Sequence, residues 1–181
     1  KKALEHINSE CRRLERLSGK MMTLIGLYDE DRIHKEPYPV EKLIQEVADL
    51  ERYHMQDSGM ELRIYSESWE YCMDVDLMES LLVNLLDNAI KASEEGSVIE
   101  LHGEKGCIWV QDHGKGIPKE EIPKITEAFY MVDKSRSRKA GGIGMGLALC
   151  QKIAEIHGAR LLIESTVGVG TRICVIFQEE D

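Results

Sequence analysis

The segment NLLDNAIKAS at residues 84–93 combines the pattern of an amphipathic helix with three polar side chains suited to binding chemistry. At about 100° per residue, Asn84, Asn88 and Lys91 fall within one narrow arc, while leucines fill another sector. An amide oxygen is a ligand suited to Mg²⁺, and a lysine is suited to phosphate. Taken alone, the spacing fits a solvated polar helix face as well as it fits a metal–phosphate site.

A second polar segment, VQDHGKGIP, follows a predicted strand. Asp112 ends that strand, and Gly114 and Gly116 allow a flat ligand to approach the backbone closely. The carboxylate can accept a hydrogen bond from an exocyclic amine such as that of adenine. A plain glycine-containing turn is an equally good interpretation of these residues alone.

A third segment, GGIGMGLAL at residues 141–149, places glycines at the start of a predicted helix. The first N–H groups and the positive dipole end of a helix form a natural phosphate site. The chain contains no GxxxxGK[ST] motif, and Leu147 stands where a GxGxxG fingerprint needs its last glycine. A fourth segment, VGVGT, ends at Thr171 between the last two predicted strands.

The composition limits which classes of protein this chain can represent. Its 181 residues are 43% hydrophobic, which suffices for one filled core with an appendage or for two small units. A net charge of −10 disfavours general nucleic-acid binding. Five cysteines without a CxxC pair predict free thiols in a reducing compartment. No apolar run approaches the ~20 residues of a membrane span, and the opening KKALEH indicates a piece of a longer protein.

The N-terminal part of the chain predicts a long helix over residues 3–28. Its apolar residues follow alternating three- and four-residue steps, which are typical of a coiled-coil or helical-bundle seam and imply a partner helix. A single amphipathic helix lying on its own domain is the alternative. Residues 29–39 then predict a hinge with a short strand near Ile33.

The remaining pattern predicts an α+β sandwich, with one mixed sheet and helices packed on one face. Asp76 is the expected N-cap of the helix that ends near Ser93. The other expected elements are helices at 40–53 and 144–157, a short helical region at 118–129, a loop at 130–143, and strands at 60–67, 98–103, 107–112, 160–165 and 172–177.

In this order, the four polar segments resemble the catalytic ATP-binding domain of bacterial sensor histidine kinases, in the GHKL superfamily with its Bergerat-type fold. The matching boxes over about residues 33–178 are NLLDNAIKAS (N box), DHGKGIP (G1), EAFYMVDKSRS (F box), GGIGMGLAL (G2) and VGVGT (G3). The resemblance implies that residues 1–29 are part of the second helix of a dimerisation and histidine-phosphotransfer hairpin. Residues 30–181 are then the catalytic domain.

The resemblance also implies roles for individual residues, with ATP and Mg²⁺ as cofactors. Asn88 holds Mg²⁺ at the triphosphate with help from Asn84, and Lys91 contacts phosphate. Asp112 binds the adenine amino group, and Thr171 lies beneath the adenine. The remaining implied ATP-binding residues are Gly114 and Gly116 at the pocket wall, Gly142, Gly144, Gly146 and Leu147 at the helix start, and Arg136 and Arg138 on a lid at 130–143.

Asn84 separates two kinds of chemistry within this superfamily. In hydrolytic relatives such as gyrase, a glutamate at the matching position activates water, and asparagine cannot act as a general base. A neutral imidazole attacks with its own lone pair and needs no base. Asn84 therefore favours transfer to histidine over hydrolysis. No HE(L/I)RTP-like acceptor segment is present, and His6 is interpreted as a helix-surface histidine.

The expected function is that of a protein-histidine kinase fragment that passes the γ-phosphate to a histidine on a phosphoacceptor helix and then to a response regulator. The parent is expected to form a homodimer through the N-terminal helix and to be membrane-anchored, with this portion cytoplasmic. One alternative is a non-catalytic nucleotide-binding or dimerisation module, because Thr126 and Ala92 differ from the family pattern. Another is an anti-sigma-type serine protein kinase, which lacks such a bundle helix.

Overall fold

The computed structural model describes residues 11, 14–15, 18–27, 33–132 and 144–178. Residues 18–26 are helical, in agreement with the predicted N-terminal helix over the part of it that is described. The further elements are β1 (Glu36–Pro39), α2 (Val40–Asp57), β2 (Glu61–Ser66), β3 (Glu70–Met73), α3 (Val75–Ala92), β4 (Val98–Glu104), β5 (Cys107–Asp112), the 3₁₀ turn η2 (Ile122–Lys124), α5 (Gly146–Ile156), β6 (Ala159–Thr166) and β7 (Gly170–Phe177).

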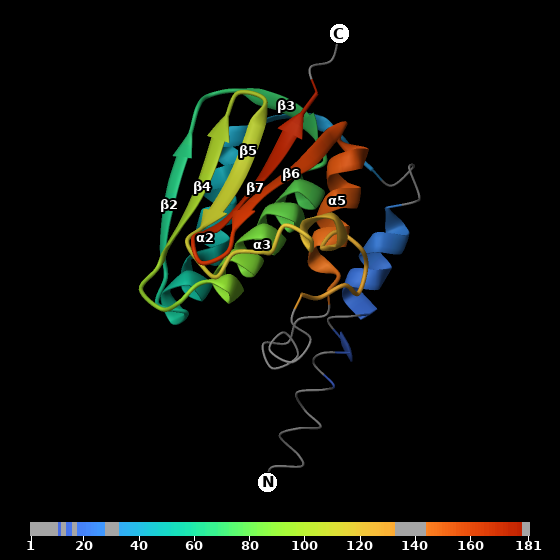
Figure 1. Ribbon diagram of the computed structural model, residues 1–181. Coiled ribbons are helices and arrows are strands. Elements are labelled where there is room, and N and C mark those ends of the chain that lie inside the picture. Colours follow the sequence, from blue (N-terminus) through green and yellow to red (C-terminus); the bar gives the residue numbers. More distant parts are fainter. Residues whose placement is uncertain (1–10, 12–13, 16–17, 28–32, 133–143, 179–181) are drawn as a thin grey trace.

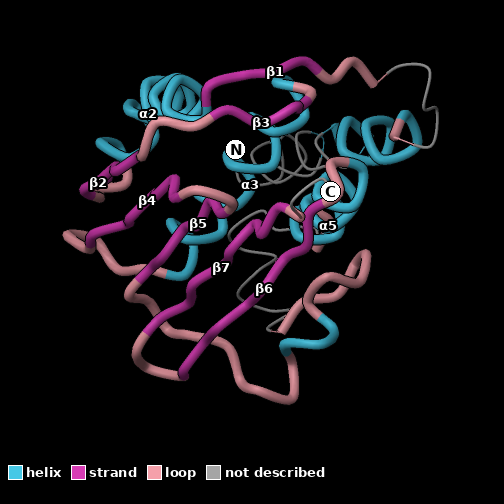
Figure 2. Tube along the Cα trace, turned by 90° about the horizontal axis from the view of Figure 1, so that it is seen from above, coloured by secondary structure: helices cyan, strands magenta, loops and turns pink. Residues whose placement is uncertain are grey.

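The main sheet has five strands in the order β2-β4-β5-β7-β6. The β2–β4 pair is parallel and the other neighbours are antiparallel, so the sheet is mixed. Helices α2, α3 and α5 lie on one face of it (Figure 1). The predicted α+β architecture is confirmed. The separate antiparallel pair β1–β3 lies beside α2 (Figure 2).

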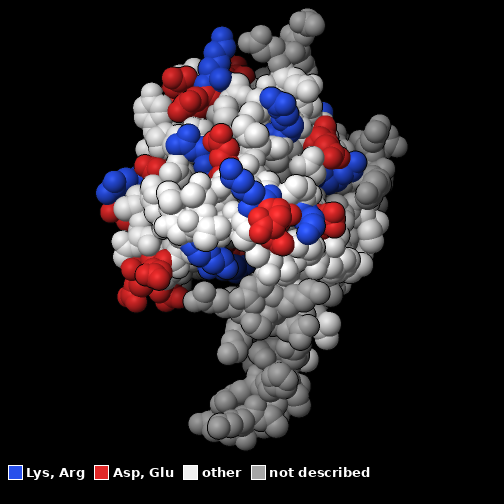
Figure 3. Space-filling model, viewed as in Figure 1, with Lys and Arg blue, Asp and Glu red and all other residues white. Residues whose placement is uncertain are grey.

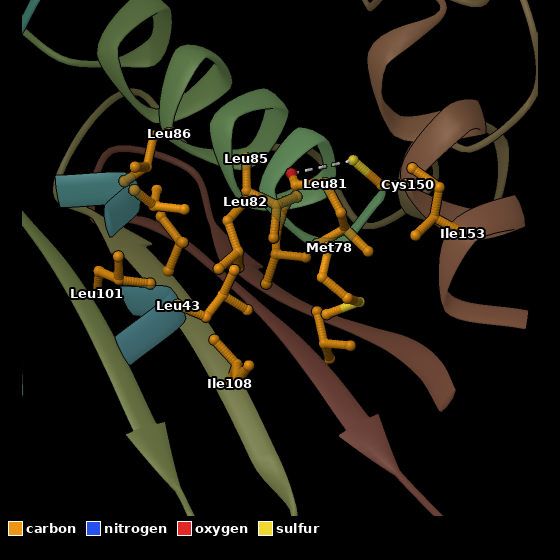
Figure 4. Packing of buried hydrophobic residues seen from close by; sticks show 14 of the residues in the cluster. Leu43, Met78, Leu81, Leu82, Leu85, Leu86, Leu101, Ile108, Cys150 and Ile153 are labelled. Carbon is orange, nitrogen blue, oxygen red and sulfur yellow. Dashed lines mark hydrogen bonds between the residues drawn. The ribbon is translucent and has the colours of Figure 1, made fainter. Parts of the chain in front are cut away.

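The core forms between α3 and the covered face of the sheet. The apolar residues of α3 recur at three- and four-residue steps, so they share one face of the helix. Figure 4 shows them packed against side chains from α2, β4, β5 and α5; the labelled residues are Leu43, Met78, Leu81, Leu82, Leu85, Leu86, Leu101, Ile108, Cys150 and Ile153. Fully burying one such side chain stabilises the fold by about 1.5–3 kcal/mol. This packing fixes which arc of α3 remains available for a ligand.

The start of α3 differs from the sequence-based expectation. Asp74, and not Asp76, is the N-cap: its backbone is extended, and its Oδ1 accepts a hydrogen bond from the N–H of Leu77 at 3.2 Å. Asp76 lies inside the first turn, where a negative charge still suits the helix dipole. The cap lies earlier because β3, a strand that the sequence pattern did not predict, ends at Met73.

Two short elements also differ from expectation. The first strand lies at 36–39 and not near Ile33, because it is defined by antiparallel pairing with β3. The predicted helical region at 118–129 contains only the 3₁₀ turn η2, in which Pro123 has no N–H to donate. At the end of this region, Phe129 adopts a positive φ of 68°, which is incompatible with a right-handed helix.

Within the described residues, no helix is both long and apolar enough to cross a membrane.

The cysteines agree with the prediction of free thiols, because none of them forms a disulfide bond: Cys11, Cys72, Cys107, Cys150 and Cys174.

Candidate functional site

A cleft of about 1030 Å³ lies between α3, the end of β5 and the start of α5. It is lined by nine of the predicted site residues: Asn88, Lys91, Asp112, Gly114, Gly116, Gly144, Gly146, Leu147 and Thr171. These residues come from all four polar segments of the sequence. The other predicted site residues in segment 133–143, Arg136, Arg138 and Gly142, lie outside the described residues.

Asn88 marks the end of the cleft that lies between α3 and α5. Its Nδ2 atom is buried and makes no hydrogen bond within the described part of the chain. An unsatisfied buried amide costs about 1–3 kcal/mol, a cost that a bound ligand removes. A Cβ placed on Gly146 would lie 3.7 Å from this Nδ2 atom and 3.3 Å from Oδ1 of Asn84. The glycine therefore leaves space where the start of α5 faces both amides.

Asn84 lies beneath this end of the cleft and not in its wall. The side chain is buried, and its Nδ2 donates to the carbonyl oxygen of Ser80 at 2.7 Å. Its Oδ1 accepts a hydrogen bond from Nζ of Lys20 at 2.6 Å. Lys20 also lines the cleft, and the sequence motifs did not identify it. No local signal indicates it, because the contact joins positions 64 residues apart.

Lys91 reaches the cleft with its charge already paired. Its Nζ contacts the Asp87 carboxylate, one helical turn earlier, at 2.5 Å. Both side chains are partly exposed, and Asp87 lines the cleft as well. The sequence motifs did not single out Asp87, although its spacing of four residues from Lys91 is the usual spacing of a helical ion pair. The ammonium has three N–H donors, so a phosphate could contact it beside Asp87, whose negative charge would oppose the phosphate.

Asp112 lies near the C-terminal end of α3, because a Cβ on Gly114 would lie 3.0 Å from Oδ1 of Asp112 and 2.2 Å from the carbonyl oxygen of Ala92. Only 5% of its surface is exposed, and its Oδ1 accepts a hydrogen bond from the N–H of Gly114 at 2.8 Å. Burial raises the pKa of the Asp112 carboxyl, and the N–H groups of Gly114 and Thr171 act in the opposite direction. A buried carboxylate facing a cleft is stabilised by a further donor, such as an exocyclic amine.

The two glycines after Asp112 are required by close backbone contacts. A Cβ on Gly114 would lie 2.2 Å from the carbonyl oxygen of Ala92, and one on Gly116 would lie 2.1 Å from that of Thr166. Gly116 also has a positive φ of 67°, which disfavours a side chain. These contacts hold the turn after β5 against the end of α3 and the β6–β7 connection.

Thr171 is buried opposite Asp112 in the β5–β7 pairing. Its Oγ1 lies 2.9 Å from Oγ of Ser165, and that Ser165 hydroxyl donates to the carbonyl oxygen of Gly170 at 3.0 Å. Since Ser165 has one hydroxyl proton, Thr171 is the donor in the contact between them. Ser165 also accepts from the N–H of Ile117 at 2.8 Å, so this residue, which the sequence motifs did not single out, joins β6 to the turn after β5.

Apolar side chains also line the cleft, beside its polar groups. They come from α3, β5, the 3₁₀ region, the residue before α5, and β7: Leu85, Val110, Ile125, Met145 and Ile173. This composition suits a flat, weakly polar ring.

The ends of segment 130–143 meet at this cleft. The N–H of Phe129 donates to the carbonyl oxygen of Gly144 at 2.8 Å, and both residues have a positive φ. Tyr130, Met131 and Val132 line the cleft on one side of the segment, and Met145 lines it on the other.

Positive and negative side chains are mixed on the surface that Figure 3 shows. Figure 3 shows Lys and Arg side chains interspersed with Asp and Glu on this face. The described residues contain no cluster of three or more His, Cys, Asp or Glu suited to a metal ion. A metal in the cleft would therefore need ligands beyond such a cluster, such as amide oxygens or oxygens of a bound ligand.

Comparisons with known proteins agree with this arrangement. Residues 73–181 match the family described as histidine kinase-, DNA gyrase B-, and HSP90-like ATPase. Sensor histidine kinase YkoH of Bacillus subtilis is 32% identical over 99% of this chain and 40% of its own length. Sensor protein SrrB of Staphylococcus aureus is 28% identical over 97% of this chain and 31% of its own length. The chain thus spans less than half of these relatives.

The fold also matches solved structures. A mycobacterial sensor histidine kinase, MprB, is similar with a TM-score of 0.66 and 25% identity, covering 79% of this chain and 96% of the other.

Proposed function

The chain belongs to the histidine kinase-, DNA gyrase B- and HSP90-like ATPase family, and we propose that its cleft binds Mg-ATP and passes the γ-phosphate to a histidine side chain. One observation carries the proposal. Four segments far apart in the sequence meet in one cleft, which contains both the unpartnered Asn88 amide and the buried Asp112 carboxylate.

The Asp112 end is the proposed adenine site. The carboxylate accepts a hydrogen bond from the exocyclic amine of adenine, while the apolar lining contacts the faces of the ring. Guanine carries a carbonyl oxygen where adenine carries that amine, so it would place an acceptor against the carboxylate. The proposed site therefore discriminates in favour of adenine.

The Asn88 end is the proposed phosphate site. The N-terminus of α5 presents its first N–H groups and its positive dipole end, with Gly146 leaving room for a phosphate. Asn88 would hold Mg²⁺ through its amide oxygen, because rotating the amide places that oxygen where the unpartnered Nδ2 now lies. Mg²⁺ held there would supply positive charge that stabilises the phosphates. Lys91 would contact phosphate through N–H donors of its ammonium that Asp87 does not engage.

Asn84 bears on the choice between transfer and hydrolysis. Its amide is engaged by Ser80 and Lys20 and has no atom that accepts a proton at neutral pH. In the proposed reaction, the lone pair of a neutral imidazole nitrogen forms the N–P bond. The bond between the γ-phosphorus and the bridging oxygen breaks, and ADP leaves with that electron pair. No general base is needed for this step.

The N-terminal helix supports a proposal about assembly. Met21, Met22 and Ile25 are 40%, 67% and 60% exposed, respectively, although their type suits a buried seam. Residues 1–29 are proposed to be part of a phosphotransfer hairpin that forms a homodimer in the parent protein, with residues 30–181 as its catalytic domain. The parent is further proposed to be membrane-anchored, with this portion cytoplasmic, and to pass phosphate to an aspartate of a response regulator receiver domain.

The first experiment is calorimetric titration of the whole chain with a non-hydrolysable ATP analogue, in excess Mg²⁺ and in excess EDTA. Binding that requires Mg²⁺ supports the proposed site, and absence of binding in both conditions contradicts it. A longer protein that also carries a phosphoacceptor helix is then incubated with ATP. Acid-labile phosphohistidine supports the kinase function. Binding without phosphorylation supports a non-catalytic module, and acid-stable phosphoserine supports an anti-sigma-type kinase.

A further inference from the structure

Lys20 places a cation from the N-terminal helix at the proposed metal–phosphate end of the cleft. Its Nζ lies 2.6 Å from Oδ1 of Asn84. A Cβ on Gly146 would lie 3.7 Å from the same Nζ, so the ammonium also lies near the start of α5. Figure 1 shows the helical segment 18–26 beside α5.

The helix that carries Lys20 is anchored by apolar packing. Leu27 is buried in the core, and Leu24 packs against it in a partly buried position. Residues 20, 24 and 27 follow helical spacing and therefore share one face. The charge of Lys20 also lowers the pKa of the Cys150 thiol, although burial has the larger effect and raises it to about 12. The Cys150 thiol donates a hydrogen bond to the Leu81 carbonyl oxygen, so it lies where α5 contacts α3.

The Lys20 contact conflicts with the expected help of Asn84 in holding Mg²⁺, because both would use the Asn84 amide oxygen. Magnesium binds oxygen ligands at about 2.0–2.1 Å. An ion at that distance from Oδ1 of Asn84 would lie within about 5 Å of the Lys20 ammonium, where two cations repel. In addition, Lys20 lines the cleft whereas Asn84 does not.

We propose that Lys20 is an internal cation that holds Asn84 when no nucleotide is bound, and that it must leave Asn84 before Mg-nucleotide binds there. The proposal rests on the function proposed above. Because such coupling is reciprocal, a docked N-terminal helix weakens Mg-nucleotide binding, and Mg-nucleotide weakens docking of the helix. In the longer protein from which this chain is expected to come, a rearrangement of the N-terminal helix would therefore change the affinity of the cleft for Mg-nucleotide.

The test compares Lys20→Met with the parent chain and with the control Lys42→Met. Methionine keeps a long apolar stem and removes the charge. Lys42 lies on α2 outside the cleft lining, where its partners are Tyr38 and Glu46. Each protein is titrated with the non-hydrolysable ATP analogue in excess Mg²⁺ and in excess EDTA. Lys20→Gln, with thermal unfolding of every variant, guards against a folding defect.

We expect Lys20→Met to bind about tenfold more tightly than the parent in Mg²⁺, as loss of one competing charged hydrogen bond implies. The gain should be absent in EDTA, and Lys42→Met should match the parent in both conditions. A second readout is hydrogen exchange in residues 18–26, which should become faster in the parent chain when Mg-nucleotide is added.

Several results would overturn the inference. Weaker binding by Lys20→Met would indicate that Lys20 is a phosphate ligand. Equal binding would indicate that its contact with Asn84 does not affect nucleotide affinity. An equal gain in Mg²⁺ and EDTA would indicate simple obstruction of the cleft. In each of these cases, Mg-dependent binding by the parent would still support the proposed function. No binding by any of the proteins would overturn both.

Discussion

The imidazole of His157, at the end of α5, accepts a hydrogen bond at Nε2 from the N–H of Asp74, the N-cap of α3, at 2.9 Å. Its Nδ1 donates to the Ile153 carbonyl oxygen at 2.7 Å, so the neutral ring carries its proton on Nδ1. The Tyr71 hydroxyl donates to the His157 carbonyl oxygen at 2.7 Å. One buried side chain thus joins the two helices that border the cleft.

This contact predicts a loss of stability in mild acid. Burial lowers the pKa of His157 below its ordinary value of 6.5, so the unfolded chain takes up the proton at higher pH than the folded one. The contribution of His157 to the free energy of unfolding is therefore retained above about pH 6.5. It decreases as the pH falls below that value, by at most about 1.4 kcal/mol per pH unit for one proton. This slope is measured by urea unfolding of the parent chain at several pH values between about 5 and 8, the range in which histidine titrates.

The control for this prediction is His157→Gln, which retains hydrogen-bonding groups without titrating. We expect a shallower dependence in the variant than in the parent. Some slope should remain, because burial also lowers the pKa of His102 and that residue is unchanged. Identical slopes in the two proteins would show that His157 is not the group responsible.

Asn88→Ala is expected to remove Mg-dependent nucleotide binding and leave the fold intact. Its buried Nδ2 has no partner within the described residues, so truncation breaks no hydrogen bond of that atom. Loss of a metal ligand should weaken Mg-nucleotide by at least about 100-fold, or about 2.7 kcal/mol. Calorimetry measures the affinity, and thermal unfolding checks the fold. Glu79→Ala, on α3 but outside the cleft lining, is the matched control; equal affinity in both variants would contradict the assignment.

Asp112→Asn is expected to weaken ATP-analogue binding by about 10- to 100-fold, the range for loss of a hydrogen bond to a charged group. Binding of the corresponding GTP analogue should hardly change, because the carboxylate is proposed to bind the adenine amine. The free variant should also be more stable at neutral pH. Burial raises the pKa of Asp112, so its ionised form costs stability, while Asn can still accept from the Gly114 N–H. Equal losses for both nucleotides would rule out the proposed role.

Gly116→Ala and Gly106→Ala form a matched pair of substitutions at positive φ. Gly106 has a φ of 80° and open space where a Cβ would lie, so alanine there should cost only the conformational penalty of about 1–2 kcal/mol. At Gly116, the Cβ would also meet the Thr166 carbonyl oxygen at 2.1 Å. We expect a cost above about 3 kcal/mol, since the backbone must move, together with weaker nucleotide binding. Urea unfolding compares the two, and similar costs would show that the close contact is unimportant.

The amino-acid sequence by itself determined the features that depend on local periodicity. The leucine spacing of 75–92 sets one buried arc of α3 and leaves Asn88 and Lys91 on the arc that lines the cleft. The strand that ends at Asp112, and the glycines that follow it, are equally local. These signals were sufficient to predict the helices and most of the strands, because side-chain period and backbone freedom are properties of neighbouring residues. The family followed from the resemblance of the polar segments.

Only the tertiary structure decided which distant groups share a partner. Because β3, which pairs with β1, ends at Met73, the N-cap of α3 is Asp74 and not the expected Asp76. The docked N-terminal helix places Lys20 against Asn84, which is 64 positions away in the sequence. The burial of Asn84, away from the cleft wall, likewise depends on how the helices pack against one another. Such contacts are set by strand register and by the packing of whole elements, and neither is encoded in the spacing of residues within one segment.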